Sequence, residues 1–389
     1  MPDFDVVVVG GGLIGMAAAL SMSKMSYKVL LLDASPQKTD FNSNKTLVLN
    51  HASVNFLEYL GVQVADLNDH DIQKCIVSAR GHLGRVRMDA ESVNLDFLGK
   101  SISYSCLFTG LQDKILTQNN LTVKHSAYVN ELKISNRVQC KVGFEASGEQ
   151  YHTSSNLVLA ADGFNSKCRD LVGLATHMED IDYKCLVARV CMKSYPDHVA
   201  MQRFLAPGSL ATIPISDNSA SLIWTLPSSI VEIRESLSQK SLISIARSEL
   251  GNSASYFKEI IGQPESYSPK LQYAEKCSVP GLVLLGSAAI NLLPITAQGL
   301  NIGLRDIIAL ENILLESKTI SWDEYNATQY NKIRKQDHLF CYRQVKYLQK
   351  IFSHTNPPLN FIRSFAMSSL SILPMFTGTL ATKGAGYSP

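Results

Sequence analysis

Three glycines near the N-terminus have the spacing of a turn that binds a dinucleotide. Gly10, Gly12 and Gly15 form the pattern GxGxxG between an apolar run and a helix-compatible stretch. In such a turn one glycine permits a tight bend, one lets the backbone approach a pyrophosphate, and one allows the helix to pack closely. Asp33 ends the next apolar run, where a carboxylate can bond ribose hydroxyls. A glycine-rich turn without a ligand is the alternative, and the spacing does not distinguish NAD from FAD.

A second candidate turn is Asp162-Gly163, in the segment ADGFNSKCR. It follows the apolar run 157–161, which is predicted to be a buried strand, and precedes a predicted helix start. Asp-Gly is common in ordinary turns. Its place between a strand and a helix favours a turn that contacts a ligand.

A third candidate is the stretch 286–306, GSAAINLLPITAQGLNIGLRD. A strand is predicted over 281–285 and a helix from Gly299 onward. A helix that begins at such a loop directs backbone N–H groups toward an anionic ligand.

These segments resemble the group A flavoprotein hydroxylases of the para-hydroxybenzoate hydroxylase type. That family has ADGxxSxxR at the second turn, and GDAAH followed by P, GQG, N and D at the third. The residues that fit the third pattern are Pro294, Gln298, Gly299, Asn301, Gly303 and Asp306. Ser287 stands where the family has Asp, Ile290 where it has His, and Ala297 where it has the first Gly of GQG.

Further stretches narrow the resemblance to the ubiquinone-biosynthesis hydroxylases of the UbiH/UbiF/COQ6 type. They are RGHLG at 80–84, QRF at 202–204, LATIP at 210–214, Trp224, and the spacing of Tyr330, Arg334 and Asp337. For any single residue of the QRF and LATIP stretches, ordinary packing in a sheet is an equally good explanation. Lys45 stands where the family has Arg, and lysine keeps the charge but loses the planar fork of donors. Together with Ser287, this predicts weaker retention of FAD.

The resemblance implies the site residues. FAD would be held by Gly10, Gly12, Leu13, Gly15, Asp33, Lys45, Val129, Asp162, Gly163, Gly286, Ser287, Pro294, Gln298, Gly299, Leu300 and Asn301. The substrate pocket would include Phe204, Pro214 and Trp224. No catalytic residue is assigned, since His51 and His82 are candidates only by proximity and a lone histidine is more often structural. No metal site is expected.

The implied activity is hydroxylation of a polyprenylated phenol in ubiquinone biosynthesis, with NAD(P)H reducing FAD and the reduced flavin activating O₂. An apolar chamber that excludes water would protect this chemistry. One alternative is a weakly FAD-binding or non-catalytic subunit of a ubiquinone-biosynthesis complex. Another is a different FAD oxidoreductase such as a reductase or a halogenase, although the chain has no WxWxIP segment.

The elements that must position these residues predict an α/β fold: a Rossmann-like FAD-binding domain, an inserted antiparallel-sheet substrate domain and C-terminal helices. The first domain would comprise 1–180 and 275–320, with segments near 70–110 in the substrate lobe. The sheet would occupy 181–274 and the helical region 321–389. Paired strands are expected over 121–135 and 138–144, and helices over 231–250 and 322–351.

Composition limits the remaining choices. The chain has 389 residues, 46% of them hydrophobic, and a net charge of +2 without a basic cluster, which argues against nucleic-acid binding. Eight cysteines without CxxC pairs favour reduced thiols in a cytoplasmic protein. Acidic residues precede the first apolar run, so a signal peptide is not expected. The uncharged segment 365–382 predicts a packed or interfacial helix, with shallow contact at the inner face of a membrane as the minority option. An oligomer is compatible with the sequence.

Overall fold

The computed structural model describes residues 2–37, 45–82, 84–135, 139–193, 198–251, 256–295, 297–353 and 374–387. Part of the predicted C-terminal helix, 365–373, therefore lies outside the described residues. Helix α10 (Pro374–Gly384) covers the remainder of that prediction. None of the described helices has the length and hydropathy needed to cross a bilayer.

The first lobe is built on an eight-stranded sheet within the described residues. Its parallel centre runs in the order β20-β11-β1-β2-β8, and β1 pairs directly with both β11 and β2. The strands are β1 (Phe4–Val9), β2 (Val29–Leu32), β8 (Leu121–Lys124), β9 (Ala127–Ile134), β10 (Cys140–Ala146), β11 (Glu149–Ala160), β19 (Ser278–Val279) and β20 (Leu282–Leu284). The central strands are continuous apolar runs because helices bury them, as parallel sheets require.

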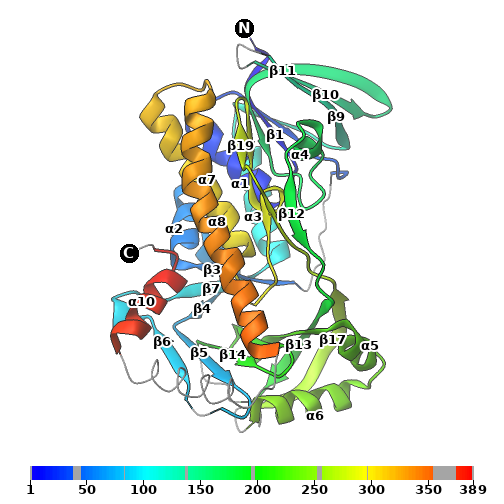
Figure 1. The fold of residues 1–389 in the computed structure, drawn as a ribbon, viewed down its shortest axis with the longest axis vertical. Coiled ribbons are helices and arrows are strands. Elements are labelled where there is room, and N and C mark those ends of the chain that lie inside the picture. The colour runs from blue at the N-terminus through cyan, green and yellow to red at the C-terminus, as the bar shows by residue number, and fades with distance from the viewer. Residues whose placement is uncertain are drawn as a thin grey trace.

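Helices α1 (Leu13–Lys24), α3 (Tyr104–Leu116) and α7 (Gly299–Ser317) pack beside this sheet (Figure 1). β9 and β10 form the antiparallel extension drawn at the top of the figure. Paired strands were expected over 121–135 and 138–144, but residues 121–124 instead form β8. They join the parallel centre because β8 pairs with β2.

The second lobe holds a seven-stranded sheet in the order β17-β13-β16-β15-β14-β5-β6, counted over the described residues. The strands are β5 (Lys74–Ala79), β6 (Val86–Asp89), β13 (Tyr183–Met192), β14 (Val199–Phe204), β15 (Ser209–Ser216), β16 (Ser219–Pro227) and β17 (Phe257–Tyr267). All pairs are antiparallel except β14–β5, which is parallel. Helices α5 (Ser228–Glu235) and α6 (Gln239–Leu250) bury one face of this sheet. The fold class is therefore as predicted.

Smaller elements connect the two lobes. Two three-stranded sheets contain β3 (Thr46–Asn50), β4 (His70–Ile72) and β7 (Gly99–Ser103), and β12 (Thr176–Glu179), β18 (Leu271–Ala274) and β21 (Ile290–Asn291). The remaining helices within the described residues are α2 (His51–Tyr59), α4 (Lys167–Leu171), α8 (Glu324–Ser353) and the 3₁₀ turns 64–66, 91–93 and 286–288. Figure 1 shows α8 running along both lobes, with α10 beside β6.

Candidate functional site

The glycine turn joins the end of β1 to the start of α1. Gly10 adopts φ +109°, and a methyl group on Gly15 would lie 1.8 Å from the Gly10 carbonyl oxygen, so both glycines are required by the turn itself. Gly12 differs, because nothing lies within 4 Å of where its methyl group would be, and it lines a large cavity. The turn thus presents open backbone to that cavity.

Asp33 lies directly beside this turn. A methyl group added to Gly11 would lie 2.3 Å from the Asp33 carboxyl carbon. Asp33 Oδ1 accepts a hydrogen bond from the Ser35 backbone N–H at 3.0 Å, and His125 Nδ1 lies 3.6 Å from Oδ2. The carboxylate is therefore held where the sequence placed it, at the end of β2 next to the glycines.

The Asp162-Gly163 turn is connected to the third motif. Asp162 Oδ2 accepts from the Cys168 N–H at 2.9 Å, and the Ser166 hydroxyl caps α4 by accepting from the Arg169 N–H at 3.0 Å. Arg169 then donates to the carbonyl of Ala288 at 3.2 Å, next to Ser287. Among the described residues, the buried Asp162 Oδ1 has no hydrogen-bond partner. A buried acceptor of this kind is costly without a donor, so it suits a site that a ligand completes.

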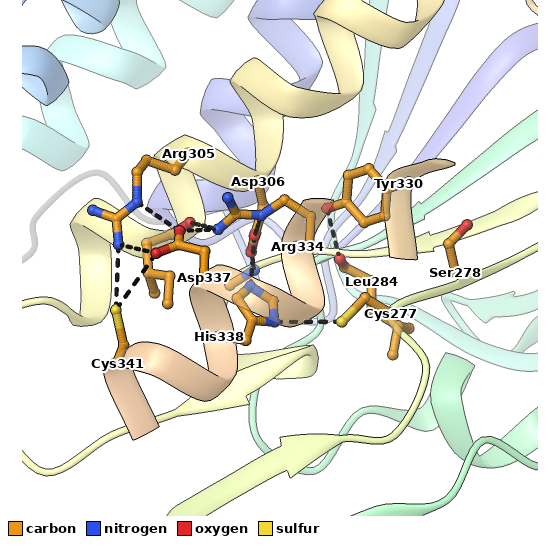
Figure 2. Close-up of polar contacts among 12 residues, drawn as sticks. Cys277, Ser278, Leu284, Arg305, Asp306, Tyr330, Arg334, Asp337, His338 and Cys341 are labelled. Atoms are coloured by element: carbon orange, nitrogen blue, oxygen red, sulfur yellow. Dashed lines mark hydrogen bonds and ion pairs between the residues drawn. The ribbon is translucent and has the colours of Figure 1, made fainter. Parts of the chain in front are cut away.

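The turn at Gly286 is held by the buried carboxylate of Asp306, whose contacts with Arg334 and His338 are drawn in Figure 2. Asp306 Oδ2 accepts from the Gly286 N–H at 2.9 Å, while its Oδ1 lies 2.6 Å from Arg334 Nε and 2.8 Å from His338 Nε2. His338 Nδ1 lies 3.3 Å from Cys277 Sγ. Asp306 comes from α7 and its two cationic partners from α8, so the network joins both helices to the third motif.

Charge explains the ionisation of this network. Burial acts to lower the pKa of His338, but the Asp306 carboxylate, assisted by Cys277, raises it to about 9. Burial acts to raise the pKa of Asp306, yet His338 and Arg334 keep it below its usual value. Burial likewise acts to raise the pKa of Asp337, whereas Arg334 and Arg305 lower it to about 2. The sequence singled out Arg334 and Asp337 by their spacing, and the structure gives them this bracing role.

Helix α7 begins at the edge of the cavity. Asn301 Oδ1 accepts from the Asn50 N–H at 3.0 Å, and its Nδ2 donates to the carbonyls of Val48 and Ala297 at 2.9 and 2.8 Å. Gln298 Oε1 accepts from Arg305 at 3.2 Å. Ala297 adopts φ +52°, a left-handed conformation that favours the glycine found there in the resembling family. The side chains of Asn301 and Gln298 thus fix the loop that bounds the cavity.

A cavity of about 1610 Å³ extends from the glycine turn to the second sheet. The predicted residues that line it are Gly12, Leu13, Lys45, Gly163, Phe204, Ser287, Pro294, Gln298, Gly299, Leu300 and Asn301. Those that do not are Gly10, Gly15, Asp33, Val129, Asp162, Pro214, Trp224 and Gly286. Apolar side chains of the second sheet, including Val187, Ile213 and Ile223, form its far wall.

Trp224 and Pro214 were expected to line the substrate pocket, but neither lines the cavity. Successive strand residues face opposite sides, so Ile223 lines the cavity while Trp224 is fully buried among the residues under α5 and α6. Trp224 Nε1 donates to Glu249 Oε2 at 2.8 Å. The carbonyl of Pro214 accepts from the Ser101 hydroxyl. Both residues therefore support the sheet rather than line the pocket.

The histidine candidates also lie outside the cavity lining. His51 Nδ1 lies 2.7 Å from the hydroxyl of Tyr387 near the C-terminus, and burial lowers the pKa of His51. His82 does not line the cavity either. Tyr267 was not among the predicted site residues, yet it lines the cavity, and Lys45 Nζ lies 5.6 Å from its ring centre. It lies at the end of an ordinary strand, where no local signal marks it.

The residues present fit FAD. The turns at Gly12 and Gly163 are open to the cavity, and Lys45 and Ser287 line the same space. Next to Gly163, the buried Oδ1 of Asp162 has no hydrogen-bond partner among the described residues. Among the described residues, no three His, Cys, Asp or Glu side chains are grouped so that they could hold a metal ion. The site can therefore hold an anionic, ring-bearing cofactor against an apolar wall.

Comparison with known proteins gives a consistent picture. The family model described as FAD binding domain matches residues 3–336. The 3-demethoxyubiquinol 3-hydroxylase of Escherichia coli strain K12 is 25% identical over 93% of this chain and 93% of its own length. The human ubiquinone biosynthesis monooxygenase COQ6 is 22% identical over 94% of this chain and 89% of its own.

Solved structures share the fold. The p-nitrophenol 4-monooxygenase PnpA of Pseudomonas putida DLL-E4 superposes with a TM-score of 0.77 at 14% identity, covering 99% of this chain and 98% of that one. PqsL of Pseudomonas aeruginosa, described as a probable FAD-dependent monooxygenase, superposes with a TM-score of 0.76 at 18% identity, covering 93% and 99%.

Proposed function

This chain belongs to the FAD binding domain family and is an FAD-dependent monooxygenase, and from that premise we propose that it hydroxylates the ring of a polyprenylated phenol in ubiquinone biosynthesis, using NAD(P)H and O₂. The names of the relatives support this pathway. The observation that carries the proposal is the cavity of about 1610 Å³ that joins the glycine turn to an apolar sheet face. Sites for one small ligand are usually about 300–1,000 Å³, so this space suits a cofactor together with a long apolar substrate.

When bound, FAD supplies the electron transfer and the oxygen activation. The residues of this chain would bind the cofactor and orient it. The open backbone at Gly12 suits the pyrophosphate, Asp33 suits ribose hydroxyls, and the Lys45 ammonium suits a phosphate charge. The Ser287 hydroxyl can exchange a hydrogen bond with the cofactor but brings no negative charge.

The substrate side of the cavity is apolar, so a bound substrate that fills it would displace water. Phe204, Val187 and Ile223 present apolar surface where a phenol ring and its prenyl chain would lie. Excluding water protects reactive intermediates from wasteful side reactions. Phe204 is the residue that we expect to affect the yield of product per NAD(P)H consumed.

The test begins with purified protein and a visible spectrum recorded with and without added FAD. NADH and NADPH oxidation are then followed with a short-chain prenylated phenol under ¹⁸O₂, and the product is analysed by mass spectrometry. We expect a flavin spectrum, phenol-dependent acceleration and one ¹⁸O atom in the product. Phe204→Ala should divert a larger share of the NAD(P)H into H₂O₂, whereas Tyr128→Ser on the distant strand β9 should not.

Two results would count against the proposal. No flavin bound at saturating FAD would overturn an enzymatic role and favour the non-catalytic subunit of a biosynthetic complex. Flavin binding with NAD(P)H oxidation that yields only H₂O₂ with every phenol tried would mean that the substrate class is wrong.

A further inference from the structure

The cavity reaches the surface between α8 and α10. Among its lining residues, Ile333 and Phe340 of α8 are each 47% exposed and Leu380 of α10 is 37% exposed. A residue that both lines a cavity and faces solvent marks its opening. Gln336 and Gln344, also exposed lining residues of α8, lie in the same row. The opening is therefore bordered by apolar and uncharged side chains, together with the exposed Lys383 of α10.

The opening lies along an exposed apolar stripe on α8. Ile333, Phe340 and Tyr347 are seven residues apart, and Tyr347 is 61% exposed. Seven residues correspond to about two turns with a drift of about 20°, so the three side chains share one face over about 21 Å of helix. Single exposed apolar residues are ordinary, but a contiguous exposed apolar patch marks a site of interaction.

Cations flank this stripe. Lys332, Arg343 and Lys350 are exposed, and their positions in the helix place them in one row on the same side of the apolar residues. Lys383 of α10 reaches over the ring of Phe340, 5.5 Å from its centre. Lys346 lies beside this row of cations, farther around the helix from the apolar stripe, and pairs with Glu179 at 2.5 Å.

Acidic side chains are scarce on this helix. After Glu324 at its first residue, α8 carries one further carboxylate, Asp337, which Arg305 and Arg334 hold in ion pairs. An exposed apolar stripe flanked by cations is the pattern of a helix that lies at the surface of an anionic membrane.

We propose that the exposed face of α8 and α10 docks on an anionic lipid bilayer. Ile333, Phe340 and Tyr347 enter the headgroup boundary, and the neighbouring cations lie against phospholipid phosphates. A ligand with a long apolar chain then passes from the bilayer into the cavity without crossing water. Only this last step rests on the proposed function, because docking itself requires neither flavin chemistry nor substrate.

The test is co-sedimentation of the FAD-saturated full-length protein with vesicles, without NAD(P)H or phenol. Vesicles of phosphatidylcholine alone are compared with vesicles containing phosphatidylglycerol, at low and high salt. We expect binding to the anionic vesicles that salt weakens. The double variant Lys332→Glu/Arg343→Glu should bind at least about tenfold more weakly, since each cation near such a surface contributes about 1 kcal/mol. Tyr347→Ser should also weaken binding to the anionic vesicles, because the variant has less apolar surface to insert into the bilayer.

The matched control is Lys124→Glu/Lys141→Glu with Tyr128→Ser, in the first lobe at β8, β9 and β10. It makes the same kinds of change on exposed residues and should bind vesicles like the unaltered protein. Circular dichroism of each variant checks its fold.

Absence of binding to anionic vesicles at low salt would overturn the proposal, as would equal loss in the α8 and control variants. A change of oligomeric state in the α8 variants, with vesicle binding unchanged, would assign this face to a second copy of the chain instead. Hydroxylation can fail while vesicle binding persists, and the converse also holds, so the two proposals are tested separately.

Discussion

His338 should make the stability of this protein fall as the pH rises from neutral to alkaline. Its imidazole is almost fully buried, and its Nε2 lies 2.8 Å from the Asp306 carboxylate, which raises its pKa from 6.5 to about 9. Because the folded value is the higher one, the stabilisation is fully present below about pH 6.5 and is lost as the pH passes about 9. The difference corresponds to about 3 kcal/mol, since each unit of pKa is worth 1.36 kcal/mol.

The variant His338→Gln removes the titrating group and keeps a side chain of similar reach. The free energy of unfolding is measured by urea denaturation at about pH 6 and about pH 9.5, with FAD held at a fixed saturating concentration. The two tryptophans, Trp224 and Trp322, are fully buried and report unfolding by fluorescence. We expect the advantage of the unaltered protein over the variant to shrink by about 3 kcal/mol between these pH values.

A control histidine separates this effect from general alkaline destabilisation. The side chain of His152 is 63% exposed, so His152→Gln should leave the pH profile unchanged. If the unaltered protein and His338→Gln lose stability in parallel, His338 is neutral in the folded state and the assignment of charge in the Asp306 network is wrong.

Three further predictions concern the loops at the cavity. Ala297→Gly should raise the melting temperature in differential scanning fluorimetry, because the left-handed conformation at this position costs alanine about 1 kcal/mol; a lower melting temperature would show that the added freedom of the unfolded chain dominates. Ser287→Asp and Lys45→Arg, both toward the family pattern, should each tighten FAD in a fluorescence titration. The aspartate should do so about tenfold, since a hydrogen bond involving a charged group contributes about 1.5–3 kcal/mol, and the arginine because its planar fork offers more donors than the ammonium; unchanged affinity would place these side chains away from the cofactor. Gly12→Ala should leave the unfolding free energy within about 0.5 kcal/mol but weaken FAD binding, whereas Gly15→Ala should lose the fold by circular dichroism; equal stability of the two variants would contradict the packing described for the turn.

The fold class was predictable because its signals are local. Glycine spacing marks the first turn, and continuous apolar runs mark the buried parallel strands, so both can be read without knowing the partners. The cavity-lining roles of Gly12, Gly163 and Ser287 follow from the same loops. The confirmed α/β architecture and FAD-dependent family therefore depend on short segments of sequence.

The remaining parts of the site depend on distant contacts. Trp224 was expected in the pocket, but which face of β16 meets the cavity is decided by the sheet and the helices that cover it. His338 contacts the carboxylate of Asp306, 32 positions earlier in the chain. Asp306 belongs to the third motif, but no local pattern marks His338 as its partner. The opening at Phe340 and Leu380 requires α10 to return beside β6, which no periodicity of α8 predicts.

The parallel pairing of β14 with β5 has a consequence for synthesis of this protein. Lys74 pairs with Val199, so β5 and β6 leave the ribosome roughly 120 residues before the strand that completes their sheet. Translation proceeds at about 5–20 residues per second, so the edge of β5 that later pairs with β14 stays exposed for roughly 6–25 seconds. The yield of soluble protein on expression should therefore depend on translation speed and chaperone supply through this interval, and less on the stability of the finished molecule.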